Sequence, residues 1–167
     1  MALDLRGYLQ WRCSEMLVME RDMWNLRNLM ARETHDARLK EALARDSEPI
    51  RQQISHLEQI VDKLGGLLGP DEHPVTQGML RAHRQFMALE PSAELRDIHH
   101  ALEADKIAHF TLSGYQALIT LARHLGEEDI ARVLQDDTQH DERMCTILEG
   151  LTPEVFSAYD RQARRAA

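Results

Sequence analysis

The stretch that decides the fold is "GGLLGPDEHP" at residues 65–74, which holds three glycines and two prolines. This composition ends a helix and begins a connection, because glycine accepts the backbone conformations that follow helix ends and proline cannot continue a helix. On both sides of it, apolar residues recur at the spacing of amphipathic helices. The stretch therefore divides the chain into two helical halves.

Each half is predicted to form a pair of long antiparallel helices. A shorter helix at 75–89 lies inside the connection, which continues to residue 92. Thr34 and Ser92 are the expected N-caps of the second and third long helices, and Thr152 with Pro153 opens a short C-terminal helix. The expected long helices are residues 3–32, 34–64, 92–124 and 127–149.

This order of elements favours a ferritin-like four-helix bundle. Two helical hairpins joined by a long crossover between the second and third helices distinguish that fold from up-and-down bundles. The length of 167 residues suits a single hydrophobic core. We therefore expect one all-α domain that spans residues 1–167.

Composition and charge argue against several kinds of partner. The net charge is −8 and the isoelectric point is near 5.6, so neither nucleic acid nor a membrane surface is expected to bind. No segment is apolar enough to span a membrane and the N-terminus does not resemble a secretion signal, which predicts a cytoplasmic location. Cys13 and Cys145 lie on apolar helical stripes, so both are expected to be buried, reduced thiols.

Some polar residues nevertheless fall on the apolar faces of the first two predicted helices. At 100° per residue, Glu20 and Arg27 lie among the methionines of the first helix. Asp46 and Gln53 fall among the leucines and isoleucines of the second. These side chains are expected to point into the bundle.

The fourth predicted helix carries a denser polar group in "DDTQHDERM", residues 136–144. Asp137 lies at the centre of the inner face, and His140 and Asp141 flank it. Carboxylates and an imidazole three or four residues apart on one helix can contact the same ion.

Two explanations for the inward acids remain open from these residues alone. In the first, Glu20, Asp137, His140 and Asp141 bind iron or manganese, as acids and histidines of facing helices do in other bundles. In the second, Arg27 and a protonated His140 neutralise the acids in a buried network. Either would offset the cost of burying carboxylates.

The third helix argues against a full two-metal site, because no carboxylate points inward at its middle. His109 is expected on its outer side. His99 and His100, near its start, are expected to have ordinary surface roles, and the spacing of His83 in the crossover indicates nothing.

Three stretches carry a resemblance to a known family, namely "SHLEQIVDKLGG" at 55–66, "YQALITLARHLGEEDIARVLQ" at 115–135 and "DERM" at 141–144. In order and spacing they resemble the YciE/YciF group of bacterial ferritin-like proteins, over about residues 8 to 150. The resemblance implies a stress-associated protein with metal-ligand candidates on all four helices. It places Glu20 and Gln53 at two of those positions.

The sequence departs from the pattern of this family at several acidic positions. The expected acids of the second and third helices fall on Pro49, Ala108 and Thr111, and the expected acid pair of the fourth helix falls on His140 and Asp141. The comparison implies a site for one metal ion at most, or an inert remnant. A kink at Pro49 offers one way to turn Glu48 inward.

We therefore consider three functional classes. The leading hypothesis is a stress-associated bundle whose metal site is altered or lost, with Glu20, Gln53, Asp137, His140 and Asp141 as candidate ligands for iron or manganese. The second is a diiron or dimanganese oxidoreductase, which needs more ligands than the chain provides. The third is a metal-free interaction scaffold. Nothing indicates a substrate.

Self-association as a homodimer is also predicted. Val18 and Leu29 fall on the polar side of the first helix, where a row of apolar residues favours a partner. The first hairpin and the crossover are the expected contact regions.

Overall fold

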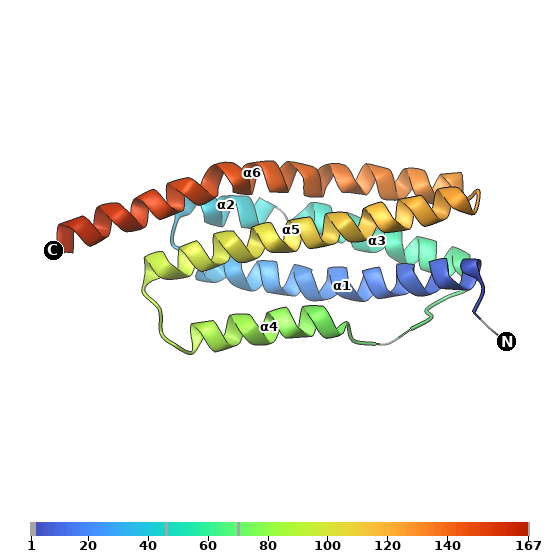
Figure 1. Ribbon diagram of the computed structural model, residues 1–167, viewed down its shortest axis with the longest axis horizontal. Coiled ribbons are helices and arrows are strands. Elements are labelled where there is room, and N and C mark those ends of the chain that lie inside the picture. The colour runs from blue at the N-terminus through green and yellow to red at the C-terminus, as the bar shows by residue number, and fades with distance from the viewer. Residues whose placement is uncertain (1–2, 46, 70, 167) are drawn as a thin grey trace.

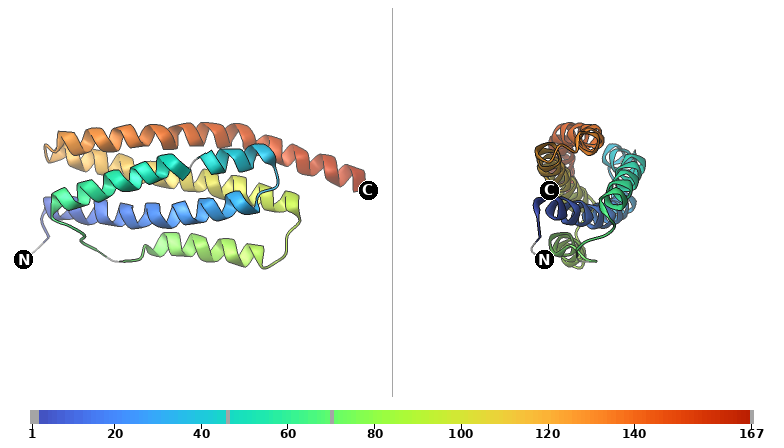
Figure 2. Two further views of the ribbon diagram at one scale, coloured as in Figure 1. Left: turned by 180° about the vertical axis from the view of Figure 1, so that it is seen from behind. Right: turned by 90° about the vertical axis from the view of Figure 1, so that its right-hand side faces the viewer.

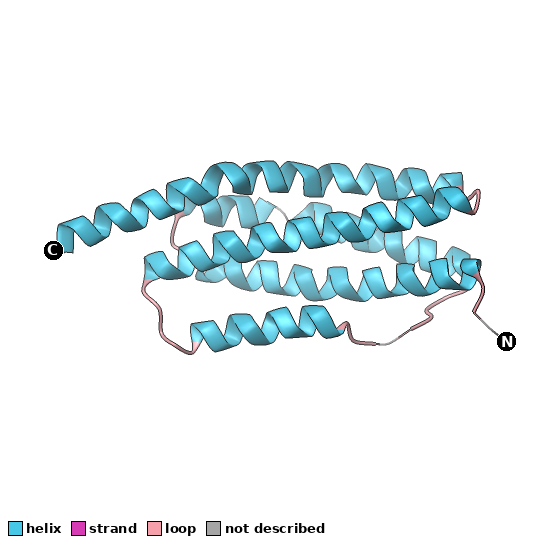
Figure 3. Cartoon of the chain, in the orientation of Figure 1, coloured by secondary structure: helices cyan, strands magenta, loops and turns pink. Residues whose placement is uncertain are grey.

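The computed structural model of the chain describes residues 3–45, 47–69 and 71–166, so Asp46 lies outside the described part. Within it, all regular secondary structure is helical (Figure 3). The helices are α1 (Leu5–Glu33), α2 (Ala37–Arg45), α3 (Ser47–Leu64), α4 (Pro74–Met87), α5 (Ala93–His124) and α6 (Glu128–Ala166). The predicted all-α class is confirmed.

The long helices form a bundle of two antiparallel hairpins (Figure 1). In one hairpin α1 is followed by α2 and α3, which together occupy the second position, and in the other α5 packs against α6. An end-on view places α4 outside this arrangement, beside α1 (Figure 2). The crossover between the halves therefore contains a helix of its own, as predicted.

The start of the second helix differs from the prediction, because Thr34 closes α1 and does not cap the next helix. Its hydroxyl donates to the carbonyl of Met30 at 2.7 Å. Asp36 supplies the cap for α2, since its carboxylate accepts from the backbone amides of Arg38 (3.0 Å) and Leu39 (2.9 Å).

The predicted second helix is also divided into α2 and α3, and Pro49 lies in the first turn of α3. A proline is tolerated there because the amide it lacks would have no partner within the helix. Glu48 stays exposed and pairs with Arg51 at 3.5 Å. The proline therefore does not turn Glu48 into the bundle.

The C-terminal segment continues α6 without interruption, so the prediction of a separate short helix was wrong. Pro153 lies inside α6 and is exposed, which leaves water free to solvate the backbone carbonyl that a proline cannot bond. The last part of α6 extends past the end of the bundle (Figure 1).

The core is continuous along the bundle and contains both cysteines, which are free and buried as predicted. Burial raises the pKa of Cys13 to about 12, so its thiol stays protonated. Among the described residues, no helix is both long enough and apolar enough to cross a membrane.

Candidate functional site

The inward polar residues gather at the middle of the bundle, where all but His56, whose side chain is 41% exposed, are buried. Glu20 and Asp141 have no exposed surface, and Arg27 and Gln53 are nearly as buried. We call this group the central network. It consists of Glu20 and Arg27 of α1, Gln53 and His56 of α3, Thr111 and Tyr115 of α5, and Asp137 and Asp141 of α6.

Protein donors approach both carboxylate oxygens of Asp141. The Gln53 amide donates to one oxygen at 3.1 Å and to the backbone carbonyl of Asp137 at 3.1 Å. The Thr111 hydroxyl lies 3.1 Å from the other oxygen, and the Arg27 guanidinium lies 3.9 Å from that oxygen. Each of these contacts comes from a different helix, so Asp141 joins α6 to the rest of the bundle.

The Thr111 hydroxyl has one proton and several acceptors within reach. Besides Asp141, the backbone carbonyls of Ile107 and Ala108 lie 3.1 Å away. A hydrogen bond to a buried carboxylate is stronger than one to a carbonyl that already accepts within its helix. We therefore assign the Thr111 proton to Asp141.

Asp137 is held from the other side by a histidine. His56 places its Nδ1 atom 2.8 Å from one carboxylate oxygen of Asp137, while the other oxygen is buried without a hydrogen bond. Burial raises the pKa of Asp137, and the nearby His56 partly offsets this effect. Sequence reasoning missed His56, because its role depends on the contact that α6 makes with this side of α3.

Tyr115 marks the point around which the three acids gather. It is fully buried, and its pKa is raised by burial and by the charges of Glu20, Asp137 and Asp141. The structure thus brings together four of the five predicted site residues, namely Glu20, Gln53, Asp137 and Asp141.

The fifth predicted residue, His140, lies apart from them at the flank of the bundle. It is half-buried and lines a surface cavity together with Pro49 and Met144.

The central network does not fit a two-metal centre. Ala108 and Thr111 occupy the positions where the resemblance to the YciE/YciF group implies acids, and Thr111 donates to Asp141 and does not act as an acidic ligand. Among the described acids and histidines, no three of the central network bring ligand atoms within 4.8 Å of one another. Binding of one metal ion by Glu20, Gln53, Asp137, His140 and Asp141 stays a prediction.

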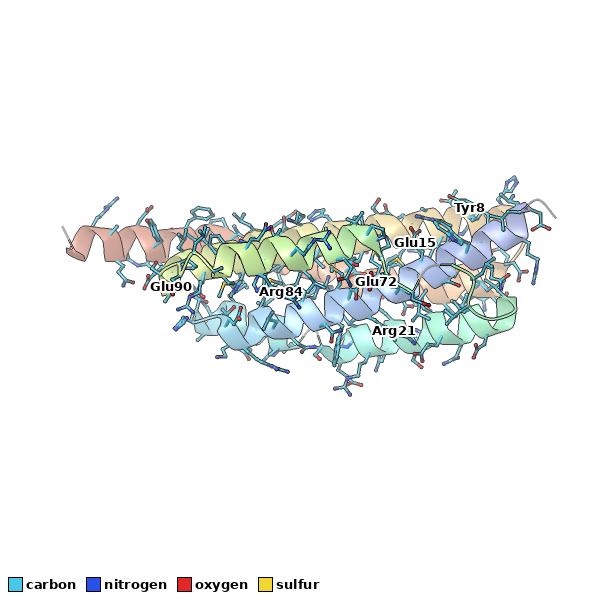
Figure 4. All side chains as sticks on the ribbon, turned by 90° about the horizontal axis from the view of Figure 1, so that it is seen from below. Tyr8, Glu15, Arg21, Glu72, Arg84 and Glu90 are labelled. Carbon is cyan, nitrogen blue, oxygen red and sulfur yellow. The ribbon has the colours of Figure 1, made fainter. Side chains whose placement is uncertain are left out.

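A second buried polar group lies where α1 ends, α5 begins and the C-terminal half of α4 packs against the bundle. Figure 4 shows α4 lying across α1, with Glu90 just beyond its C-terminal end. We call this group the histidine cluster, and it consists of Glu33, His83, His99 and His100. The expected surface roles of the histidines were wrong for His100, which has no exposed surface, and His83 is 1% exposed.

The histidine cluster is organised around the Glu33 carboxylate. One carboxylate oxygen of Glu33 lies 3.2 Å from Nε2 of His83 and 3.7 Å from Nε2 of His100. The Nδ1 atom of His83 lies 3.3 Å from Nε2 of His99. Burial and the neighbouring histidines lower the pKa of His100 to about 3, and burial lowers the pKa of His99 as well.

Comparison with known proteins identifies the family. A family model described as "Domain of unknown function (DUF892)" matches residues 9–160. The chain belongs to this family. Protein YciF of Escherichia coli K12 is 24% identical over 113 residues, which cover 67% of this chain and 68% of YciF. The resemblance to the YciE/YciF group is thereby confirmed.

Solved structures of relatives share the DUF892 fold of this chain. The crystal structure of the E. coli stress protein YciF has a TM-score of 0.83 at 20% identity, covering 93% of this chain and 99% of YciF. YcfI of Rhodopseudomonas palustris, which has been proposed to be a structural protein, has a TM-score of 0.81 at 20% identity, covering 87% and 93%. These likenesses confirm the ferritin-like bundle.

Proposed function

We propose that this protein is a stress-associated structural member of the DUF892 family in which the original metal site of the bundle is lost. In this proposal the central network holds the four helices together and carries out no redox chemistry. The relatives called a stress protein and a structural protein have the same fold, which supports assigning a role of this class.

The observation that carries the proposal is the environment of Asp141. A carboxylate that binds a metal must direct lone pairs at the ion, whereas both oxygens of Asp141 face donors from Gln53 and Thr111. The buried Arg27 guanidinium adds a fixed positive charge nearby. A protein cation and two neutral donors therefore replace what a metal would supply.

The proposal is tested by measuring metal-dependent stability and iron oxidation. Both measurements use the Glu33→Gln variant, because the histidine cluster also contains residues of metal-binding types and an ion bound there would obscure the result. We expect that manganese or ferrous iron leaves its melting temperature unchanged. We also expect ferrous iron to oxidise in air no faster than with the protein omitted.

The opposite result has a clear form. If manganese raises the melting temperature of Glu33→Gln, and Asp141→Asn in the same background removes that rise, the central network binds metal and the proposal fails. Rapid iron oxidation that disappears with Asp141→Asn would favour the oxidoreductase alternative.

We further propose that the chain forms a homodimer through the crossover. Val18 and Leu29 are half-buried within one chain, whereas Leu67 and Leu89 of the crossover are 65% and 76% exposed. These leucines lie at the two ends of the crossover, and large exposed apolar side chains favour a protein partner over solvent. Light scattering should give twice the mass of the 19.2 kDa chain, and a monomer mass at high concentration would overturn this proposal.

A further inference from the structure

Three residues of the histidine cluster are metal ligands by type and come from three distant parts of the chain. Glu33 ends α1, His83 lies in α4, and His100 lies in the second turn of α5. Their ligand atoms, one from each residue, all lie within 4.8 Å of one another, and in the described part of the chain this is the only group of three acids, histidines or cysteines that does so. The two histidines are fully or almost fully buried.

The hydrogen bonds of the His100 ring allow the tautomer that a metal ligand needs. Its Nδ1 atom lies 2.9 Å from the Thr34 hydroxyl oxygen. The same hydroxyl lies 2.7 Å from the Met30 carbonyl. With its proton on that carbonyl, the oxygen accepts from His100, so Nδ1 carries the hydrogen and Nε2 carries a lone pair, which is the state that a metal ligand needs.

This lone pair of His100 has no hydrogen-bond donor near it. Its Nε2 atom is buried without a hydrogen bond, and the nearest charged group is the Glu33 carboxylate at 3.7 Å. Two acceptors that face each other repel unless a positive charge lies between them.

His83 has a partner on its far side that suits a metal ligand. Its Nδ1 atom lies 3.3 Å from Nε2 of His99, whose ring stacks on Phe86 with the ring centroids 4.0 Å apart. Histidines that bind metal through one nitrogen usually donate the hydrogen of the other to a fixed neighbour. His99 is placed to accept that hydrogen and so to orient His83.

We propose that Glu33, His83 and His100 bind one divalent transition-metal ion, for which Zn²⁺ is the best match, with water as a fourth ligand. In a tetrahedral zinc site, nitrogen and oxygen ligands at about 2.0–2.1 Å from the ion lie about 3.3 Å from one another. Glu33 lies 3.2 Å and 3.7 Å from the two histidine nitrogens, so small side-chain shifts suffice. Two histidines and one carboxylate are also a common ligand set for zinc and ferrous iron.

An ion at this position would join α4 to the bundle. The carboxylate comes from the end of α1, one imidazole from the crossover helix and the other from the start of α5, so all three segments would share one ion. Glu33 is half-buried, with 29% of its side chain exposed, which leaves a side open to water or to a small ligand. This site is separate from the central network, and the proposal is independent of the proposed function.

Isothermal titration with Zn²⁺ tests the proposal on the full chain purified without a histidine tag and treated with a chelator. We expect one ion per chain for the wild type. Loss of a residue that only orients a metal ligand lowers metal affinity by about 10- to 100-fold. The zinc affinity of Glu33→Gln and of His83→Gln should fall by more than this, and the zinc affinity of His99→Ala should fall by an amount in this range. His109→Gln, which removes an exposed histidine of α5, should bind like the wild type.

Circular dichroism of each metal-free variant separates loss of binding from loss of fold. Equal zinc affinity in the wild type, Glu33→Gln and His83→Gln would overturn the proposal, because the ion would then lie elsewhere. Absence of binding to the wild type at millimolar Zn²⁺ would overturn it as well, and would mean that a proton shared between Glu33 and His100 is sufficient. If a ligand variant does not fold, the zinc-dependent rise in melting temperature of His99→Ala relative to the wild type decides.

Discussion

The central network and the histidine cluster are both buried groups of acids and histidines drawn from several helices, and their lone pairs are used in opposite ways. At the centre, Asp141 accepts from Gln53 and Thr111, and a guanidinium lies nearby. In the histidine cluster, Nε2 of His100 faces the Glu33 carboxylate with no donor between them. The centre has the larger number of acids, and one oxygen of Asp137 there also lacks a hydrogen bond, but among the described residues only the cluster brings ligand atoms of three residues together.

The difference teaches that the number of acidic residues does not by itself identify a metal site. A carboxylate that accepts two protein hydrogen bonds gains little from an ion, because those bonds must be broken before the ion binds. A neutral imidazole that donates the hydrogen of one nitrogen to a protein acceptor can bind an ion through the other nitrogen without breaking a hydrogen bond. What identifies a site is the set of acceptors that remain after the protein donors are assigned.

The largest expected effect comes from removing the positive charge of the central network. Arg27→Met should lower the free energy of unfolding by about 3–5 kcal/mol, since a buried carboxylate is left without its cation. The matched control is Arg21→Met on the same helix, whose guanidinium is exposed and pairs with Glu58 at 2.7 Å (Figure 4). That change should cost about 1 kcal/mol or less, measured by urea denaturation. Equal losses in the two variants would mean that the central network does not depend on Arg27.

The next largest effect is expected from removing the hydrogen bond that Thr111 donates to Asp141. Thr111→Val keeps the shape of the side chain but removes the hydrogen bond to Asp141, which should cost about 1.5–3 kcal/mol. Thr120→Val is the control, because its hydroxyl donates to the Gln116 carbonyl at 2.9 Å on the exposed face of the same helix. This control should change the unfolding free energy by about 0.5 kcal/mol or less. A Thr111→Val variant as stable as the control would assign the Thr111 proton to the backbone instead.

The same kind of substitution in the histidine cluster should act on metal binding. Thr34→Val removes the acceptor that keeps the hydrogen of His100 on Nδ1, so the ring is no longer held with its Nε2 lone pair toward Glu33. We expect zinc affinity to fall by about 10- to 100-fold, as measured by isothermal titration. Thr120→Val again serves as the control. An unchanged affinity in Thr34→Val would contradict the assigned ring state of His100.

The smallest expected effect is a dependence on pH at the centre. Because the pKa of Asp137 is raised in the folded state, its stabilising contribution is complete below 3.8, the value for the free side chain, and is lost as the pH rises through the folded pKa. The unfolding free energy of the wild type relative to Asp137→Asn should therefore decrease as the pH rises from below 3.8 to neutral.

The control for this pH measurement is Asp160→Asn, an exposed position on the same helix. Relative to that variant, the wild type should show no such decrease. A difference between the wild type and Asp137→Asn that increased with pH would mean that His56 outweighs burial.

Most of the fold was predictable because it depends on local patterns. The glycines and prolines of residues 65–74 end one helix and start the crossover whatever the rest of the chain does, and the structure places α4 within that crossover. Helix ends were less predictable. Thr34 and Asp36 are both good N-cap residues, and only the turn between α1 and α2 decides which one is used.

The two polar groups were unequally predictable for a related reason. Glu20, Gln53, Asp137 and Asp141 lie on helix faces whose apolar residues reveal the inward direction. His83 and His100 lie in segments whose burial depends on how α4 packs outside the bundle, which no single-helix pattern contains. The adjacent histidines His99 and His100, near the start of α5, were the only sequence signal of this cluster, and such a pair is ordinary on a protein surface.

The most direct test of the comparison is an anomalous difference map from crystals of the full chain equilibrated with zinc. Zinc binds sites of nitrogen and oxygen ligands more tightly than manganese or ferrous iron does, so it should report on both polar groups at once. We predict a peak bounded by Glu33, His83 and His100 and no peak beside Asp141. A peak beside Asp141, with none at the histidine cluster, would contradict the account of both groups.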